Sequence, residues 1–175
     1  MPHDPGVAVY ISVGSNVAPE QHLRLACREL RARFGELEAS SVYRNSPVGF
    51  EGEDFLNLVV RVRTVLPPLE VIAHLEQVHA LAGRVRGGAR FGPRTLDLDL
   101  LLYGEVLSPE PPIRVPRPDI RRYAFVLGPL AELAPDLRHP ETGETIATLW
   151  AAFDQRSHPL HRVGRLDSQG GLVAG

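Results

Sequence analysis

Two aspartates, Asp97 and Asp99, stand two residues apart in the apolar segment GPRTLDLDLLLYG, residues 92–104. Side chains alternate between the faces of a strand, so both carboxylates point to one face and the neighbouring leucines to the other. At about 3.3 Å per residue their Cα atoms lie roughly 6–7 Å apart, which lets the oxygens converge on shared cations. Hard oxygen ligands with no cysteine or histidine nearby suit Mg²⁺, and two such ions can bridge phosphate oxygens. We therefore expect a two-magnesium site at this aspartate pair.

The segment before this strand carries four positive charges and no acid, on Arg84, Arg86, Arg90 and Arg94. Guanidinium groups bind phosphate oxygens through paired hydrogen bonds, and the intervening glycines allow the segment to close over a ligand. Residues 83–93 are accordingly predicted to be a lid. Taken singly, the aspartates fit a solvated edge strand and the arginines a solvated basic loop. Together they indicate a site for a polyphosphate bound through Mg²⁺.

Length and composition narrow the class of protein. The 175 residues fit one domain, and that length buries a core without metals or disulfides. All 19 basic residues are arginine, so the chain has neither a P-loop lysine nor a Schiff-base lysine. The net charge of −2 predicts no nucleic-acid or membrane partner. Cys27 is the single cysteine and falls in an amphipathic helical pattern, so it is predicted to be a core residue.

No basic, apolar leader is seen at the N-terminus, and no apolar run approaches membrane-spanning length. We therefore expect a cytoplasmic protein, which we take to be a monomer.

The apolar pattern predicts strands interleaved with two helices. Strands are predicted at 7–13, 37–45 and 55–65 and within 92–104, and helices begin at Pro19 and at Pro67-Pro68. The order β-α-β-β-α-β, with both helices on one face of an antiparallel sheet, is that of a ferredoxin-like α+β sandwich. A proline-rich remainder adds an extra C-terminal strand and helices, with short helices near 125–133 and 145–153. We expect one domain over residues 1–163 and a flexible tail over 164–175.

The block GRVRGGARFGPRTLDLDLLLYG resembles the signature of the 6-hydroxymethyl-7,8-dihydropterin pyrophosphokinase family. Similar matches are YISVGSN at 10–16, SSVYRNSPVG at 40–49, DFLNLVV at 54–60 and VP-x₈-FVLGPLAELAP at 115–135. The resemblance covers the chain from about Val7 to about Phe153. It implies that the β,γ-pyrophosphoryl group of ATP passes to the pterin hydroxymethyl oxygen in folate synthesis, with AMP released and two Mg²⁺ ions bound.

The resemblance also implies roles for individual residues. Asp97 and Asp99 hold the metal ions and act in catalysis together with Arg84 and Arg94, which contact ATP phosphates. Arg86, on the moving loop, and Arg117 also bind ATP. The pterin is bound by Val48 and Gly49 lining its pocket, Asn57 hydrogen-bonding its edge, and Phe55 and Phe125 stacking on its ring.

Some positions depart from the family's usual residues. His79 stands where the family usually has glutamate, and Arg117 where it usually has histidine. Tyr123 stands where an arginine is common, and Arg121 or Arg122 is close enough to supply that charge. Phe91 stands where some members have a lid tryptophan. Arg117 keeps a donor for phosphate or ribose oxygens, whereas His79 introduces a group that titrates near neutrality. We expect these changes to tune ATP affinity and rate without changing the reaction.

Rival interpretations stay open. A diverged pyrophosphokinase would act on another heterocyclic alcohol, because Asn57 and the aromatic pair favour a flat nitrogen heterocycle without naming it. A ferredoxin-like RNA-binding module requires aromatic residues on basic central strands. Only 6% of residues are aromatic, and the Asp-Leu-Asp strand, taken as central, would repel phosphate unless metal ions intervene. The retained Asp97, Asp99 and Asn57 argue against an inactive paralogue.

Overall fold

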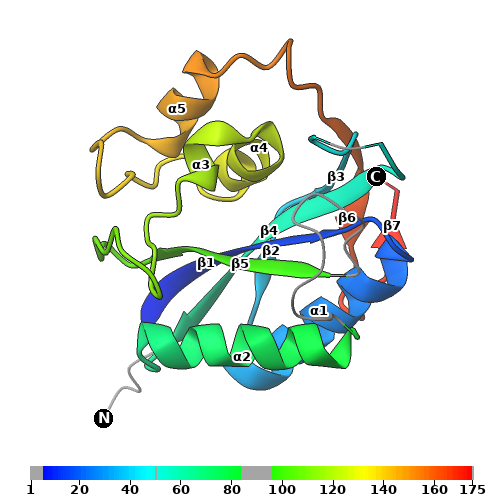
Figure 1. The fold of residues 1–175 in the computed structure, drawn as a ribbon, viewed down its shortest axis with the longest axis horizontal. Helices are drawn as coiled ribbons and strands as arrows, with labels where there is room; N and C mark the ends of the chain where they lie inside the picture. The colour runs from blue at the N-terminus through cyan, green and yellow to red at the C-terminus, as the bar shows by residue number, and fades with distance from the viewer. Residues whose placement is uncertain (1–5, 50, 84–95, 175) are drawn as a thin grey trace.

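Antiparallel strands form one sheet at the centre of the protein (Figure 1). The structure is a computed structural model that describes residues 6–49, 51–83 and 96–174. The strands are β1 (Val7–Ser15), β2 (Glu38–Ala39), β3 (Val42–Asn45), β4 (Phe55–Thr64), β5 (Asp97–Tyr103), β6 (His161–Leu166) and β7 (Leu172–Val173). Their order is β5-β1-β4-β3-β6-β7, and β2 also pairs with β4. Within the described ranges, no helix has the length and apolar character needed to cross a membrane.

Helices cover both faces of this sheet (Figure 1). One face is covered by α1 (Pro19–Phe34) and α2 (Pro68–Leu81), the other by α3 (Asp119–Arg122), α4 (Ala124–Leu133) and α5 (Ile146–Ala152). The first core joins Leu98 and Leu100 of β5 to the apolar faces of α1 and α2. The second lies between Tyr10, Val59 and Leu101 of the sheet and apolar residues of α3, α4 and α5. The prediction that both long helices share one face is confirmed.

The sequence of α1 shows why this helix packs as it does. Its buried residues Leu23, Ala26, Cys27 and Leu30 recur with a helical period, which gives one apolar stripe. Gly35 ends the helix with φ at 84°, a left-handed value that favours glycine, and its N–H donates to Arg31 O at 2.9 Å. Cys27 is a core residue as predicted, and burial raises the pKa of its thiol to about 11.

The strand predicted over residues 37–45 is interrupted at Ser40 and Ser41, so it forms β2 and β3 instead. Serine hydroxyls compete with the ladder for backbone partners, and here the Val59 N–H donates to Ser40 Oγ at 3.0 Å. Ser41 donates its hydrogen bonds to a helix instead of a strand. Both its N–H and its hydroxyl donate to the Glu132 carboxylate of α4, at 3.0 and 2.7 Å. The Tyr43 hydroxyl donates to the same carboxylate at 2.8 Å. Glu132 therefore connects the break between β2 and β3 to α4.

Replacing Glu132 with glutamine is expected to lower the free energy of unfolding by about 1–3 kcal/mol at pH 7, because charge-assisted hydrogen bonds are lost. Burial would raise the pKa of Glu132, but the bonds from Ser41 and Tyr43 lower it overall. The stabilisation is therefore present above the unfolded glutamate pKa of about 4.3 and is lost as pH falls through the lower folded value. Urea unfolding of both proteins at pH 7 and pH 3 measures this, with exposed Glu110→Gln as the control. An equal loss at both pH values would contradict the assignment.

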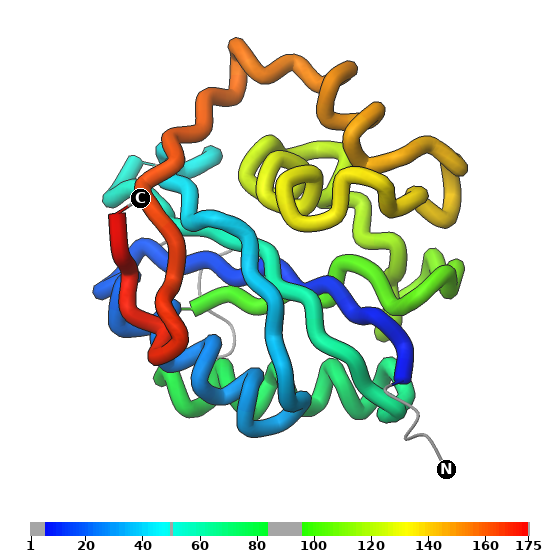
Figure 2. The backbone as a smooth tube through the Cα atoms, turned by 180° about the vertical axis from the view of Figure 1, so that it is seen from behind, coloured from blue at the N-terminus to red at the C-terminus, as the bar shows by residue number. Residues whose placement is uncertain are grey.

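The C-terminal region also differs from the prediction of a flexible tail over 164–175. Residues up to Leu166 belong to β6, which pairs with β3 and with the short β7 (Figure 2). The turn between these strands is held by Asp167, whose Oδ1 accepts from the N–H groups of Gln169 and Gly171 at 2.9 and 2.8 Å. Leu172 packs against the core formed with α1. Local carboxylate–backbone bonds thus order a glycine-rich stretch whose composition alone suggests disorder.

β5 lies at the edge of the sheet, with β1 as its partner among the described strands. The interpretation that placed the aspartates on a central strand is therefore wrong. The α2 crossover carries the chain from β4 past β1, so β5 pairs on the far side of β1.

A bulge divides β5 into two parts. Tyr10 is opposite Leu102 and Ile11 is opposite Leu100, so Leu101 is an extra residue in the ladder. Before the bulge, Leu98 and Leu100 face α1 and α2 while the aspartates face away. After it, Tyr103 faces the same core as those leucines and donates its hydroxyl to Leu66 O at 2.6 Å.

Candidate functional site

Three adjacent strands bring the predicted site residues to one face of the sheet. Gly14 of β1 is opposite Asn57 of β4 on one side and opposite Asp97 of β5 on the other. The next residue on this face of β5, Asp99, is opposite Ser12. Asn57 and Asp97 are therefore separated by about 10 Å, two strand spacings, across the backbone of β1. This is the face that α3 and α4 cover further along the strands.

Gly14 makes room for the Asn57 side chain. A Cβ at this position would lie 2.5 Å from Asn57 Oδ1, closer than such atoms approach. The amide nitrogen of Asn57 donates to Asn45 Oδ1, and Asn45 Nδ2 donates to Ser46 O at 3.0 Å. Both asparagines are buried. The Asn57 amide therefore packs against Gly14, and its bond to Asn45 orients it.

The aspartate pair has a cation beside it. Arg117 Nη2 lies 3.5 Å from Asp99 Oδ1, and Arg117 Nε lies 3.2 Å from Asp119 Oδ2. The Arg117 backbone N–H donates to Leu101 O at 2.9 Å, which ties this segment to β5. Burial disfavours the guanidinium charge, but the carboxylates of Asp99 and Asp119 more than offset it, so the pKa of Arg117 lies above its ordinary value.

His79, in the last turn of α2, supports β5 from the opposite face. The Leu98 N–H, between the two aspartates, donates to His79 Nε2 at 2.8 Å. The other ring nitrogen lies 3.4 Å from Glu76 Oε1, and the ring is buried. Because Nε2 accepts, the neutral ring carries its proton on Nδ1. His79, which was predicted to titrate near neutrality, is thus buried and bonded to the backbone of the strand that carries the two aspartates.

A pocket of about 210 Å³ lies beside the start of α4, and it brings together Val48 and Phe125, two of the predicted pterin residues. Asn45 lines it as well, which connects it to Asn57. Phe125 is stacked on Tyr123, with ring centroids 4.9 Å apart and planes 16° from parallel. Gly49, Phe55 and Asn57 are not among the residues that line this pocket. Phe55 lies opposite Asn45 in the β3–β4 ladder and shares the face of Asn57.

The predicted phosphate-binding arginines Arg84, Arg86 and Arg94 lie outside the described residues. So does most of the predicted lid, residues 83–93. Their roles stay predictions.

The donor set fits Mg²⁺ bound together with a phosphate. Within the described ranges, no group of three histidine, cysteine or acidic side chains could hold a metal ion by itself. Mg²⁺ commonly binds through one or two carboxylates, keeps several waters and takes its remaining ligands from substrate phosphates. Asp97 and Asp99, partly exposed on one strand face, offer that incomplete set of hard oxygen ligands.

Sequence reasoning missed three residues that shape this site: Gly14, Asn45 and Asp119. Asn45 belongs to the SSVYRNSPVG block, so the motif contained a signal for it. Asp119 follows Arg117 by two residues, a spacing that could have suggested the ion pair. Gly14 belongs to the YISVGSN block, but its role depends on the register that places it opposite Asn57, which the sequence does not show.

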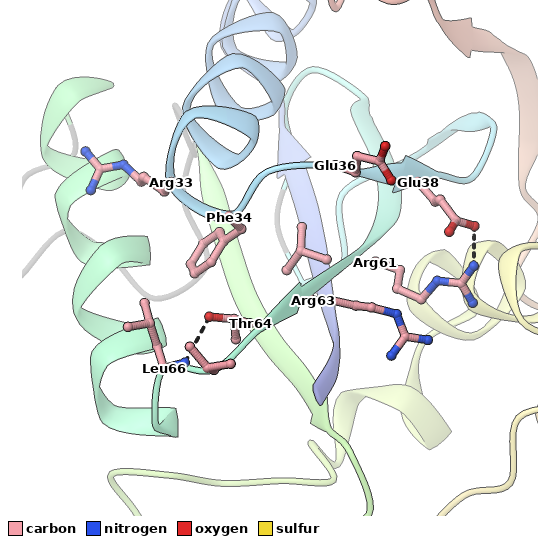
Figure 3. A pocket seen from close by; sticks show the side chains of 10 residues that line it. Arg33, Phe34, Glu36, Glu38, Arg61, Arg63, Thr64 and Leu66 are labelled. Atoms are coloured by element: carbon pink, nitrogen blue, oxygen red, sulfur yellow. Dashed lines mark hydrogen bonds and ion pairs between the residues drawn. The ribbon is translucent and has the colours of Figure 1, made fainter. Parts of the chain in front are cut away.

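A larger cavity, about 510 Å³, lies at the other end of β4, near Thr64 and Leu66 (Figure 3). Arg61 pairs with Glu38 there, and Arg33 turns away to donate to Gln77 of α2. Seven residues of strand, about 23 Å, separate Thr64 from Asn57. This cavity is not part of the carboxylate site.

Comparison with known proteins gives a consistent result. The profile of the 7,8-dihydro-6-hydroxymethylpterin-pyrophosphokinase (HPPK) family matches residues 10–135. The 2-amino-4-hydroxy-6-hydroxymethyldihydropteridine pyrophosphokinase of Pseudomonas aeruginosa is 40% identical over 148 residues, covering 82% of this chain and 90% of its own length. The Bacillus subtilis enzyme of that name is 37% identical over 137 residues, covering 76% and 81%.

Solved structures agree on the fold. The crystal structure of Plasmodium falciparum HPPK-DHPS aligns with a TM-score of 0.66 at 13% identity, covering 86% of this chain. This chain spans 45% of that longer protein. The chain belongs to the 7,8-dihydro-6-hydroxymethylpterin-pyrophosphokinase family, and it transfers pyrophosphate from ATP to hydroxymethyldihydropterin in folate biosynthesis.

Proposed function

We propose that Asp97 and Asp99 hold two Mg²⁺ ions against the phosphates of ATP, and that Asn57 and Phe125 position the pterin across β1 from them. When bound, the metal ions neutralise phosphate charge and orient the transferred group. The observation that carries this proposal is the register of Gly14, which sets Asn57 and Asp97 on either side of one glycine.

The reaction requires little covalent chemistry from the protein. The hydroxymethyl oxygen forms a bond to the β-phosphorus, and the bond from that phosphorus to the α,β-bridging oxygen breaks. AMP departs with the bridging oxygen and both electrons of that bond, and the hydroxyl proton is released. Positioning and charge stabilisation are the main sources of rate in such transfers. Buried Asn57 and Asn45 supply rigid positioning, and the aspartates with Arg117 supply organised charge.

Arg84 and Arg94 complete our proposed phosphate site, and Arg86 is proposed to act from the loop. For the pterin pocket we propose Val48, Gly49, Phe55 and Phe125. Support for the ring contacts comes from Phe125 and Val48 lining one pocket with Asn45. One face of Phe125 is covered by Tyr123, so the pterin takes the other.

We also propose that residues 7–103 form a ferredoxin-like unit, extended by α3–α5, β6 and β7 into a single domain. Support comes from the strand order β5-β1-β4-β3 and from the two long helices on one face. A cytoplasmic monomer stays the prediction from the sequence.

The test is formation of AMP and pterin diphosphate in equal amounts from MgATP and 6-hydroxymethyl-7,8-dihydropterin, measured by chromatography. The 6-methyl analogue, which has no hydroxyl, is the matched control, and with it no AMP is expected. Pterin-independent AMP formation, or none with the hydroxymethyl substrate, would contradict the proposal. If the natural chain is inactive but a His79→Glu, Arg117→His, Tyr123→Arg variant is active, the natural substrate is another heterocyclic alcohol.

A further inference from the structure

We infer that Arg117 is a built-in counter-cation of Asp99, which a divalent metal ion must displace, and that Asp119 holds the displaced guanidinium. This inference rests on the proposed metal site at Asp97 and Asp99. It assigns Arg117 a role in the protein without nucleotide, distinct from any contact with ATP.

The geometry places Arg117 between two carboxylates. Its Nη2 lies 3.5 Å from Asp99 and its Nε lies 3.2 Å from Asp119, so two nitrogens of one guanidinium contact different carboxylates. A charge-assisted hydrogen bond is typically 2.7–2.9 Å long, so both contacts are ion pairs without a tight bond, and the contact with Asp99 is the longer. About a third of each side chain is exposed, 33% for Arg117 and 30% for Asp99, so the guanidinium has room to move.

The main chain keeps Arg117 at this place whichever carboxylate it contacts. Its N–H is bound to Leu101 O at 2.9 Å, and its carbonyl accepts from the Ile120 N–H at 3.1 Å as α3 begins. Asp119 lies in the first turn of α3, two residues away. The side chain can therefore leave Asp99 without any change of backbone and keep its partner on α3.

A guanidinium and a metal ion cannot both use Asp99 without cost. Mg²⁺ binds carboxylate oxygens at about 2.0–2.1 Å, which would leave the two cations within roughly 5 Å of each other. Their repulsion at that separation is appreciable even at high dielectric. The four charges of ATP reverse the balance, because phosphate oxygens can bind both cations. Metal and nucleotide are then expected to bind cooperatively, each weak without the other.

The experiment is Mn²⁺ binding to the full chain, followed through the electron paramagnetic resonance signal of free Mn²⁺, first without nucleotide. Arg117→Gln should bind Mn²⁺ about tenfold more tightly than the natural chain, because the competing charge is gone. Arg117→Lys, which keeps the charge, should not, and neither should Arg114→Ala, which removes an exposed arginine from the same segment. Unchanged or weaker binding by Arg117→Gln overturns the inference. Circular dichroism confirms that each variant is folded.

With nucleotide bound, Arg117→Gln is expected to have the opposite effect on Mn²⁺ affinity. With α,β-methylene-ATP, whose bridging carbon prevents transfer, Arg117→Gln should bind Mn²⁺ more weakly than the natural chain. Asp119→Asn should weaken Mn²⁺ binding in the natural chain and have a smaller effect in the Arg117→Gln background. An equal effect in both backgrounds overturns the role of Asp119.

Failure of the proposed function gives a different result. If Asp99→Asn leaves Mn²⁺ binding unchanged, the metal site itself is wrong. If Asp99→Asn abolishes binding but Arg117→Gln does not tighten it, only the counter-cation is wrong.

Discussion

Replacing Asp97 or Asp99 with asparagine is expected to lower the rate of AMP formation on the order of a hundredfold to a thousandfold, the loss typical when a charge-stabilising group is removed. Asparagine keeps the size of the side chain but removes the negative charge that a hard cation requires. Because the adjacent leucines, not the aspartates, fill the core with α1 and α2, the fold should persist.

Steady-state kinetics at saturating MgATP and pterin measures this effect, together with thermal unfolding of each variant. Asp136→Asn, which neutralises an exposed aspartate after α4, is the matched control and should retain full activity. Wild-type turnover in either site variant would remove the metal assignment. A large fall in the unfolding temperature would point to a structural role instead.

Substituting alanine for Gly14 should weaken pterin binding at least about tenfold, the size of effect expected when a buried hydrogen-bonding group is displaced. The added methyl group would lie 2.5 Å from Asn57 Oδ1, so the amide must rotate away or the strands must separate. Overpacking of this kind typically costs about 1–3 kcal/mol of stability as well. Calorimetric titration of pterin in the presence of α,β-methylene-ATP measures the binding term.

Two comparisons isolate the Asn57 contact. Gly35→Ala, at a left-handed position with open space around it, should cost stability without changing pterin affinity. In an Asn57→Ala background, Gly14→Ala should have little further effect on pterin binding, because its target is already gone. Additive losses would mean that Gly14 acts through something other than Asn57.

The elements that carry a strong local signal were predictable. The apolar stripe from Leu23 to Leu30 predicts the helix α1, and Gly35 predicts where it ends. The alternation of Asp97 and Asp99 with leucines gave a strand with two distinct faces. The helices predicted near 125–133 and 145–153 correspond to α4 and α5, each a mostly apolar run.

What could not be predicted depends on contacts between distant segments. The interruption at Ser41 requires Glu132, which is 91 residues away. The edge position of β5 depends on how α2 crosses the sheet, which no periodicity records. The pairing of Arg117 with Asp99 joins residues on separate segments that only the β5 backbone brings together. In each case the decisive partner lies far along the chain, where local propensity carries no information.

The bulge at Leu101 determines which face of the sheet each later residue of β5 points to. Asp97, Asp99 and Tyr103 are all odd-numbered, so in an unbroken strand they would share a face. The extra residue sends the tyrosine hydroxyl to Leu66 on one side of the sheet while the aspartates stay on the other. If the same seven residues paired without a bulge, Tyr103 would lie on the aspartate face and lose its bond to Leu66. The bulge instead lets two consecutive leucines, Leu101 and Leu102, pack under α3 and α4 before Tyr103 returns to the core with α1 and α2.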